Sequence, residues 1–319
     1  LEPVSWDHAI EWLAGRLSEI RDESGPDALG VMTSSRSTNE AAYLLQRLFR
    51  TRIGTNNVDC CARVCHASTA LALQLSTGTG AASASYADIE QARCIVVAGA
   101  NPTEAHPVVG ARIKQAVLGG ATLIVIDPRR IELADYADVH LQLRPGTNVA
   151  LLNTLASTLI ECGLIDEPYL ESRTEGFEEL RRSLGEASSL DVESITGVPL
   201  SSVDAAARLM GEGRGVLFVS GLGLSEMTQG TASVMALCNL GMLTGSIGRP
   251  GAGMLPLRGQ NNVQGNADMG GMPDRVTGYQ RLDDPQVQDR LVRAWGAAPP
   301  VAPGLTVHEM LTAARSGDI

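Results

Sequence analysis

The sequence predicts an α/β protein of two domains, in which mostly parallel sheets are covered by helices. Its 319 residues exceed the roughly 250 to 300 residues at which a single hydrophobic core stops growing. The chain is 44% hydrophobic, with 34 glycines and only 3% aromatic residues, which suits small-residue helices packed on buried strands. From about residue 92 onward, apolar strands, polar turns and helices alternate, as they do when parallel strands are joined by crossover helices.

The N-terminal part begins with a capped helix. Ser5 precedes apolar residues at helical spacing, and Gly25-Pro26 ends the pattern. A short strand is expected at 28–32 and a second helix at 39–52. The cysteine-rich run 56–66 has neither helical nor strand periodicity, so we expect a loop there.

Four strands are expected in the middle of the chain. The apolar segments 94–98, 123–126 and 139–143 each end in a polar turn, and a fourth strand at 215–220 precedes a helix at 231–243. Residues 148–211 show the pattern of successive helices. In open α/β sheets the carboxyl ends of the strands are where nucleotides bind, because helix N-termini and backbone N–H groups point there.

The last part of the chain begins with an irregular segment. Residues 249–280 are rich in Gly, Pro, Asn and Gln without periodicity, which favours an ordered ligand-binding loop. From residue 287 the pattern returns to helix, with a last helix at 306–315.

Charge and hydropathy narrow the class of protein. A net charge of −11 without a polybasic run argues against a nucleic-acid-binding surface. No apolar run approaches the roughly 18 to 20 residues of a membrane span, so no span is expected in this segment. We expect a cytoplasmic protein. Because the chain starts at Leu1 without Met, an export signal could precede it, so a periplasmic protein is kept as the alternative.

Six cysteines are present, and three of them lie within six residues. Cys94, Cys162 and Cys238 stand in apolar patterns and are expected to be buried. Cys65 and His66 form the most informative pair, because a thiolate binds soft metals and an imidazole moves protons near neutral pH. From these residues alone, a buried core cysteine and a structural zinc site remain alternatives, although C-C-x₃-C-H lacks the paired C-x₂-C of common zinc modules.

Several motifs carry more information when they are taken in order. They are NNVDCCARVCH (56–66), VAGANPTEAHPVVGARIKQA (97–116), VIDPRR (125–130), LRPGTNVALLN (143–153), NLGMLTGSIGRPGAG (239–253) and PLRGQNNVQGNADMG (256–270). In this order they resemble the catalytic subunits of molybdopterin-dependent formate dehydrogenases, which are bis-molybdopterin guanine dinucleotide oxidoreductases. The resemblance covers essentially the whole chain.

The resemblance implies three catalytic residues. Cys65 matches the cysteine or selenocysteine that binds molybdenum or tungsten, and His66 matches the active-site histidine. Arg258 matches the arginine that holds the formate carboxylate, which a guanidinium can do in a bidentate way. Ala67-Ser68-Thr69 stands where many formate dehydrogenases have Gly-Pro, and related nitrate reductases have alanine and serine there. Turnover of another small substrate such as nitrate is therefore one alternative, although nitrate reductases usually have Met after the cysteine, so that His66 and Arg258 together favour formate. A non-catalytic scaffold subunit of the same fold is a second, separate alternative.

The resemblance also implies where the cofactor binds. The polar turns after the strands would contact the guanosine diphosphate ends of the dinucleotides, since glycines let the backbone approach phosphate and carboxylates suit guanine and ribose donors. The matching positions are Asn101, Glu104, Asp127, Arg129, Gly146, Thr147, Asn148, Gly221, Leu222, Gly223 and Gln260.

The expected architecture has two three-layer domains resembling dinucleotide-binding folds, the second inserted in the first. Residues 61–257 would form the inserted molybdopterin-nucleotide-binding domain, and 1–60 plus 258–319 a discontinuous, truncated α/β domain. The family carries an N-terminal iron–sulfur domain with a 4Fe–4S cluster and a C-terminal dinucleotide-binding domain. Neither is matched here, so we expect a central fragment that is inactive when isolated and whose complete subunit passes electrons to a partner subunit or domain.

Overall fold

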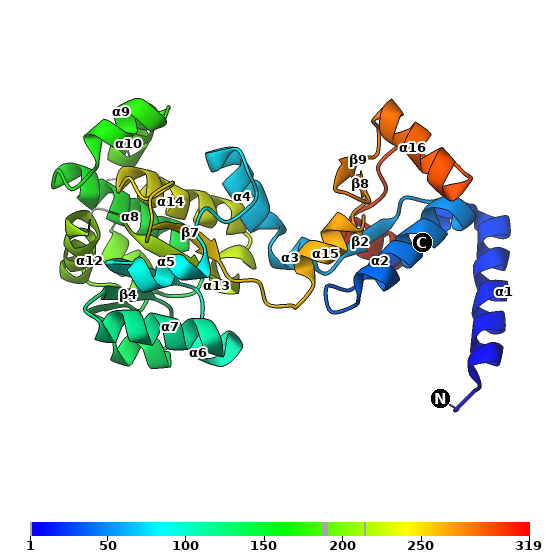
Figure 1. Ribbon diagram of the computed structural model, residues 1–319, viewed down its shortest axis with the longest axis horizontal. Coiled ribbons are helices and arrows are strands. Elements are labelled where there is room, and N and C mark those ends of the chain that lie inside the picture. Colours follow the sequence, from blue (N-terminus) through cyan, green and yellow to red (C-terminus); the bar gives the residue numbers. More distant parts are fainter. Residues whose placement is uncertain (1, 187–190, 214) are drawn as a thin grey trace. The chain divides into compact units, whose positions relative to one another are not determined.

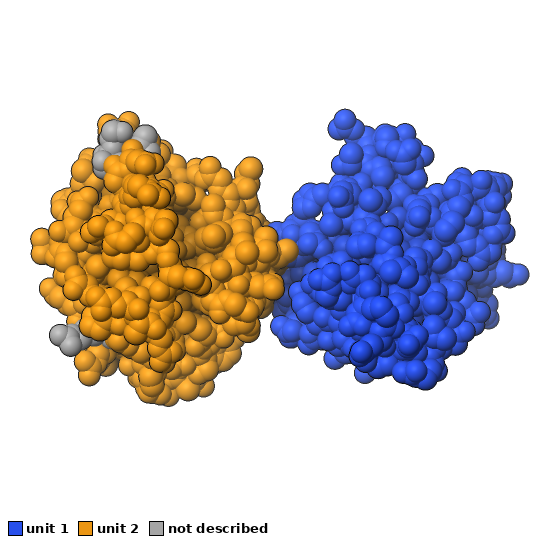
Figure 2. Space-filling view, turned by 90° about the horizontal axis from the view of Figure 1, so that it is seen from above, with its two compact units in different colours: residues 1–64, 259–319 blue, residues 65–258 orange. Residues whose placement is uncertain are grey.

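The computed structural model describes residues 2–186, 191–213 and 215–319, and the chain divides into two compact units. Unit 1 consists of residues 1–64 and 259–319, and unit 2 of residues 65–258 (Figure 2). The helices together with a five-stranded parallel sheet confirm the predicted α/β class. Which unit binds a dinucleotide stays a prediction.

Unit 2 is built on the five-stranded parallel sheet, whose strand order is β5-β4-β3-β6-β7. The strands are β3 (Cys94–Ala98), β4 (Thr122–Ile126), β5 (Val139–Leu141), β6 (Leu217–Ser220) and β7 (Gly253–Pro256). The first four confirm the strands expected from the sequence to within two residues at each end. β7 was not expected, because its four residues begin with Gly and end with Pro at the edge of the sheet, where alternation and propensity give little signal.

Helices cover both faces of this sheet and complete three layers (Figure 1). Val96 and Ala98 of β3 belong to one apolar core, while Ile95 and Val97 belong to the core on the opposite face. The first core is covered by α4 (Ala67–Thr77), α8 (Asn148–Glu161), α9 (Glu167–Arg173), α10 (Phe177–Glu186), α12 (Leu200–Glu212) and α14 (Gly230–Leu243). The second is covered by α5 (Tyr86–Gln91), α7 (Pro107–Leu118) and η3 (Glu132–Asp135).

Short helices occupy the connections of unit 2. They are α6 (Pro102–Ala105), α11 (Val192–Thr196) and α13 (Leu222–Ser225). The successive helices expected at 148–211 are confirmed for the described part of that range, and residues 187–190 lie outside the described residues.

Unit 1 contains two small sheets and several helices. Its N-terminal segment forms α1 (Trp6–Ser24), η1 (Pro26–Ala28), β1 (Val31–Thr33), α2 (Asn39–Leu48), the π-helix η2 (Phe49–Ile53), β2 (Val58–Cys60) and the start of α3 (Ala62–Cys65). Its C-terminal segment forms α15 (Val263–Asp268), β8 (Arg275–Val276), β9 (Gln280–Arg281), α16 (Pro285–Trp295) and α17 (Val307–Ser316). As expected, Ser5 caps α1, and its hydroxyl accepts from the His8 N–H at 3.3 Å. No helix in the described ranges is long and apolar enough to cross a bilayer.

The prediction of a loop at 56–66 was wrong, because β2 and α3 occupy most of it. β2 pairs in parallel with β1, Val31 standing opposite Val58. The segment shows no hydrophobic period because buried polar residues hold it: Asn57 Nδ2 donates to the carbonyl of Leu29 at 3.2 Å, and the Asp59 carboxylate accepts from Arg63 Nε at 2.8 Å. Hydrogen bonding has replaced apolar patterning here, and hydropathy does not detect it.

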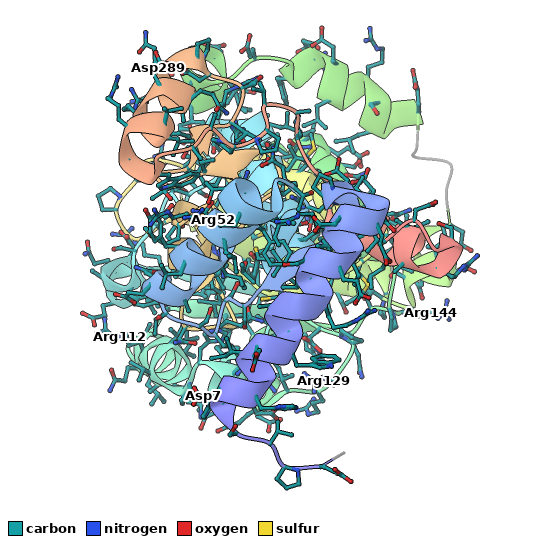
Figure 3. The ribbon with its side chains drawn as sticks, turned by 90° about the vertical axis from the view of Figure 1, so that its right-hand side faces the viewer. Asp7, Arg52, Arg112, Arg129, Arg144 and Asp289 are labelled. Carbon is teal, nitrogen blue, oxygen red and sulfur yellow. The ribbon has the colours of Figure 1, made fainter. Side chains whose placement is uncertain are left out.

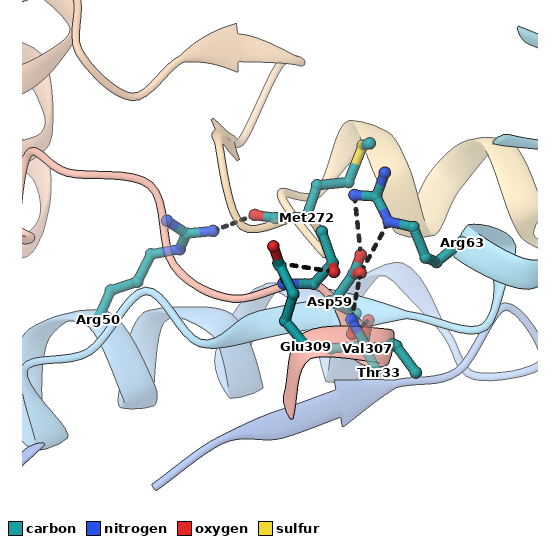
Figure 4. A network of polar contacts seen from close by, with 8 residues as sticks. Thr33, Arg50, Asp59, Arg63, Met272, Val307 and Glu309 are labelled. Carbon is teal, nitrogen blue, oxygen red and sulfur yellow. Dashed lines mark hydrogen bonds and ion pairs between the residues drawn. The ribbon is translucent and has the colours of Figure 1, made fainter. Parts of the chain in front are cut away.

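The two segments of unit 1 are joined by buried polar contacts (Figure 4). Arg50, 1% exposed, donates to Asn56 Oδ1 at 2.8 Å and to the carbonyls of Gly270, Met272 and Arg275. The Asp59 carboxylate also accepts from the Val307 N–H at 2.9 Å. Except for the bond to Asn56, each of these bonds links the N-terminal segment to residues beyond 258.

The cysteine predictions were partly confirmed. Cys94 and Cys238 are buried, but Cys162 is exposed. Cys162 is the C-cap of α8, so it lies where the helix ends and is exposed to solvent. Helical periodicity places a residue on a face of the helix but gives no warning that the helix ends there.

Candidate active site

The polar turns of unit 2 meet at one edge of the sheet. All five strands are parallel, so the turns after β3, β4, β5 and β6 lie at their shared carboxyl edge. The chain proceeds from β3 to β4 and β5 on one side, and β6 and β7 lie on the other side. The topological switch point therefore lies between β3 and β6, which in open α/β sheets is where a ligand crevice forms.

Glycines let the two turns at this switch point touch. Gly99 has φ +58°, and a Cβ built on it would lie 2.8 Å from the Gly223 Cα. The Gly223 N–H donates to the Gly99 carbonyl at 2.9 Å. A Cβ at Gly221 would lie 2.7 Å from that same carbonyl oxygen. Any side chain at these positions would force the turns apart, so the sequence keeps glycine where backbone meets backbone.

The turn after β4 presents a fixed carboxylate and an exposed guanidinium. Asp127 is 5% exposed, and its Oδ1 accepts from the Arg129 N–H at 2.8 Å. The His140 ring donates from Nε2 to the Asp127 carbonyl at 3.0 Å. The Arg129 side chain is 67% exposed (labelled in Figure 3). The turn therefore combines a buried, hydrogen-bonded Asp127 carboxylate with a solvent-exposed Arg129 guanidinium.

The turn after β5 leads directly into a long helix. Gly146 has φ +87°, Thr147 is the N-cap of α8 and Asn148 is its first residue. The Asn148 Nδ2 donates to the Gly223 carbonyl at 3.1 Å, so this turn is bound to the turn after β6. The N-terminal N–H groups of α8 and its dipole then point at the edge of the sheet.

The remaining predicted contact residues occupy the neighbouring turns. Asn101 follows β3, and its Oδ1 accepts from the Thr103 hydroxyl at 2.9 Å. Glu104 is exposed on α6, and Leu222 begins α13. Gln260 lies in unit 1, at a bend two residues after Arg258.

The predicted catalytic pair lies against the segment that carries Arg258. The His66 ring donates from Nε2 to the Leu257 carbonyl at 2.8 Å, across 191 residues of sequence. Its Nδ1 accepts from the Thr69 hydroxyl at 3.1 Å, because the carbonyl can only accept and so places the ring hydrogen on Nε2. Cys65, buried at the end of α3, precedes His66, and Arg258 follows Leu257. All of these residues belong to unit 2.

Electrostatics keeps the His66 ring neutral. Burial, and then the positive charge of Arg258, lower the pKa of His66 to about 4, against the opposing effect of its bond to Leu257. At neutral pH the ring carries no charge beside the guanidinium. It therefore adds no repulsion that would displace Arg258.

The other two clustered cysteines are held within unit 1. Burial raises the pKa of the Cys60 thiol to about 11, so it stays protonated. The Cys61 sulfur accepts from the Ser35 N–H at 3.3 Å. Over the residues that the structure describes, no group of three or more His, Cys, Asp or Glu side chains could hold a metal ion.

Sequence reasoning gave no role to several residues that hold the site together. His106 donates from Nε2 to the Arg258 carbonyl at 2.6 Å, and His140 and Thr69 hold Asp127 and His66 as described above. The Ser225 hydroxyl, buried just after the Gly221–Gly223 turn, has no hydrogen-bond partner among the described residues. His106 lies within the motif at 97–116, but the motif does not indicate which backbone carbonyl its ring contacts.

Comparison with known proteins places these features in a family. The family model described as molybdopterin oxidoreductase matches residues 1–319. Formate dehydrogenase H of Escherichia coli (strain K12) is 43% identical over 100% of this chain and 45% of its own length. The F420-dependent formate dehydrogenase 1 subunit alpha of Methanococcus maripaludis is 40% identical over 100% of this chain and 46% of its own length.

A solved structure agrees with the family match. Acetylene hydratase from Pelobacter acetylenicus matches with a TM-score of 0.68 and 29% identity, over 80% of this chain and 34% of that one. The chain thus spans less than half the length of each of these relatives. With the family model matched over its whole length and a fold shared with a solved relative, this chain belongs to the molybdopterin oxidoreductase family.

Proposed function

We propose that the full-length protein is a formate dehydrogenase catalytic subunit, which oxidises formate to carbon dioxide at a molybdenum or tungsten bis-molybdopterin guanine dinucleotide centre. The bond from His66 to the Leu257 carbonyl carries the proposal, because it brings Cys65-His66 beside Arg258. The two relatives named as formate dehydrogenases, 43% and 40% identical, support formate as the substrate.

The residues of unit 2 fit such a cofactor. The orphaned, buried Ser225 hydroxyl beside the glycine turn is a polar group that a bound phosphate or pterin could satisfy. The N-terminus of α8 suits a phosphate, and the Asp127 carboxylate suits guanine donors. We propose that Cys65 binds the metal as a thiolate and that the predicted turn residues, with Gln260, hold the dinucleotides.

Arg258 would bind and orient the substrate. Its guanidinium can donate two parallel hydrogen bonds to the two formate oxygens, which fixes the carboxylate and leaves the C–H bond pointing away from the arginine. Formate oxidation breaks that bond and yields carbon dioxide, one proton and two electrons. When it is bound, the molybdopterin centre supplies the acceptor for the two electrons.

His66 would hold the released proton. The ring is neutral, and its Nδ1 accepts only from the Thr69 hydroxyl, whose hydrogen can rotate away. Nδ1 is therefore the ring atom that can take a proton without breaking the bond from Nε2 to Leu257. A neutral ring also adds no second positive charge beside Arg258.

The wider context belongs to the same proposal. We propose that a 4Fe–4S cluster in the complete subunit passes electrons to a partner subunit or domain, and that the protein is cytoplasmic. We also propose that these 319 residues alone do not oxidise formate, since they span less than half of the relatives' length. An assay of formate-dependent dye reduction by this chain alone tests whether the 319 residues are inactive when isolated.

The test of the proposal is Arg258→Met in the full-length enzyme. Losing a charge-assisted bond costs about 1.5 to 3 kcal/mol, so kcat/KM for formate should fall roughly 10- to 150-fold. The metal content should stay unchanged, because the guanidinium binds substrate and not metal. The control is Arg112→Met, which removes a guanidinium that pairs with Glu90 on the surface of the same unit (labelled in Figure 3). Unchanged formate kinetics in Arg258→Met would refute the role of Arg258.

Nitrate is the substrate of the second candidate function, because Ala67-Ser68 stands where related nitrate reductases have alanine and serine, although those enzymes usually have Met directly after the cysteine. Dye reduction by formate and dye oxidation by nitrate, measured on one preparation, separate the two. Analysis of the bound metal is the companion measurement: molybdenum or tungsten supports either reading, and zinc alone would contradict both.

A further inference from the structure

The segment that carries Arg258 is held by two histidines. The chain leaves the sheet after β7, and the Leu257 N–H makes the last sheet-like bond, to the Ser220 carbonyl at 2.8 Å. The next two carbonyls both accept from imidazole rings: Leu257 from His66 at 2.8 Å and Arg258 from His106 at 2.6 Å. Two consecutive peptide groups are thus fixed by side chains from two different parts of unit 2.

His106 itself stands on a rigid corner. It lies between α6 and α7, where its N–H donates to the Pro102 carbonyl at 2.9 Å and its carbonyl accepts from the Gly110 N–H at 3.0 Å. Pro107 follows it and limits the backbone further. α6 and α7 are in close contact, since a Cβ at Gly110 would lie 2.9 Å from the Thr103 Cα. The ring therefore projects from a corner that has little freedom to move.

The bond acts on Arg258 through its backbone. A carbonyl only accepts, so the His106 Nε2 carries the hydrogen, and the peptide that follows the Arg258 Cα is fixed in direction. The guanidinium lies at the end of a long flexible side chain, so a small rotation of that peptide moves it much further than it moves the Cα.

We infer that His106 is a positioning residue for substrate binding, which holds the main chain of Arg258 so that its guanidinium meets the formate carboxylate. The inference rests on the proposed function, which assigns formate to Arg258. His106 also follows Asn101 and Glu104 in the turn after β3. The turn that would contact the nucleotide therefore also fixes the main-chain position of the substrate-binding Arg258.

The test compares three variants of the full-length enzyme. His106→Ala removes the donor. His106→Gln places an amide N–H₂ at about the reach of Nε2, and His106→Asn keeps an amide that falls short. Loss of one neutral hydrogen bond is expected to raise the KM for formate about 3- to 10-fold in the Ala and Asn variants, with a smaller change in kcat. His106→Gln should restore most of the affinity, and the metal content should match that of the unaltered enzyme in all three.

Tyr169→Phe is the matched control. The Tyr169 hydroxyl donates to the Ile247 carbonyl at 3.1 Å, a side-chain bond to backbone in the same unit but before β7 instead of after it. Its loss should leave the KM for formate unchanged. Hydrogen exchange gives a readout apart from activity, since the amides of residues 257–259 should exchange faster in His106→Ala and not in Tyr169→Phe.

A double variant separates this inference from the proposed function. If His106 acts through Arg258, adding His106→Ala to Arg258→Met should change formate kinetics less than about 2-fold. If Arg258→Met weakens formate use while His106→Ala and His106→Asn do not, the positioning role is overturned and the proposed function stands. If Arg258→Met has no effect, both are overturned. Should His106→Ala fail to fold or to bind metal, equal formate KM values for the Gln and Asn variants would still overturn the role.

Discussion

The two units of this chain are stabilised in different ways. Unit 2 has a continuous parallel sheet, and each face packs against its own apolar core. Unit 1 has two sheets of two strands each and two small apolar clusters, such as Leu29, Phe49, Ile53 and Val58. Buried polar residues hold much of the rest of unit 1, among them Arg50 and Asp59. A discontinuous unit must join two distant segments, and directional bonds select the correct partner where a small apolar surface cannot.

The first prediction probes the apolar side of this comparison. Phe218 is fully buried in β6 and belongs to the larger core of unit 2. Phe218→Ala should destabilise unit 2 by about 3 to 5 kcal/mol, since it removes buried area and leaves a cavity. Leu118→Ala is the control, because Leu118 is 78% exposed and its truncation should change little. Denaturant unfolding followed by hydrogen exchange of β3 and β4 measures the effect, and equal stability of the two variants would contradict it.

The second prediction probes the polar side. Burial lowers the pKa of Arg50 to about 10, against the charge of Asp274, so the guanidinium remains charged at neutral pH. Arg50→Met would leave three carbonyls and the Asn56 amide oxygen without this donor, which should destabilise unit 1 by about 3 kcal/mol.

Arg52→Met is the matched control for Arg50, because Arg52 is an exposed arginine of the same π-helix (labelled in Figure 3). Its replacement should change the free energy of unfolding by less than about 0.5 kcal/mol. Were Arg50→Met as stable as Arg52→Met, the claim that polar bonds hold unit 1 together would be wrong.

The third prediction tests how closely the two segments of unit 1 approach. A Cβ on Gly304 would lie 1.9 Å from the Asn56 carbonyl oxygen, which is a backbone atom and cannot move aside as the end of a side chain can. Gly304→Ala should therefore cost about 1 to 3 kcal/mol through overpacking. Gly15→Ala, in α1 with nothing within 4 Å of its added Cβ, should instead stabilise the helix by up to about 1 kcal/mol. Thermal unfolding of both variants checks the opposite signs.

Much of unit 2 could be predicted because its signals are local. β3 reads Cys-Ile-Val-Val-Ala, a run buried on both faces, and polar turns and helices follow its neighbours in the expected order. β7 could not be predicted, because an edge strand of four residues that ends in Pro256 has no such run. In unit 1, β2 was not predicted because it also lacks an apolar pattern. Its region contains the buried polar residues Asn57 and Asp59, whose hydrogen-bond partners lie far away in the sequence.

The candidate site likewise has a part that the sequence predicts and a part that only the structure shows. The motifs identified Cys65, His66 and Arg258 as candidates, but their physical relation depends on a bond between His66 and a backbone carbonyl. Backbone acceptors have no residue type, so no sequence pattern could reveal that His106 holds the Arg258 carbonyl. The roles of the predicted catalytic and cofactor-binding residues remain proposals that the Arg258 and His106 variants test.

The smallest expected effect concerns the cap of the last helix of unit 1. The Glu309 carboxylate accepts from the Thr306 N–H at 2.8 Å and from the Thr306 hydroxyl at 2.7 Å, which completes a capping box for α17. These bonds, the one to the backbone first, lower the pKa of Glu309 below its ordinary value of 4.5. A lowered pKa in the folded state means that the contribution to stability is complete above the ordinary value and is lost as pH falls through the folded one. Glu309→Gln should therefore lower Tm slightly at pH 7, and the difference in Tm from the unaltered chain should narrow below about pH 4.

Glu161→Gln is the control. Glu161 is the last residue of α8, so this substitution removes a negative charge from a helix C-terminus and should not lower Tm. A Tm difference for Glu309→Gln that stays constant from pH 7 to pH 3 would show that the charge of Glu309 contributes nothing to the cap.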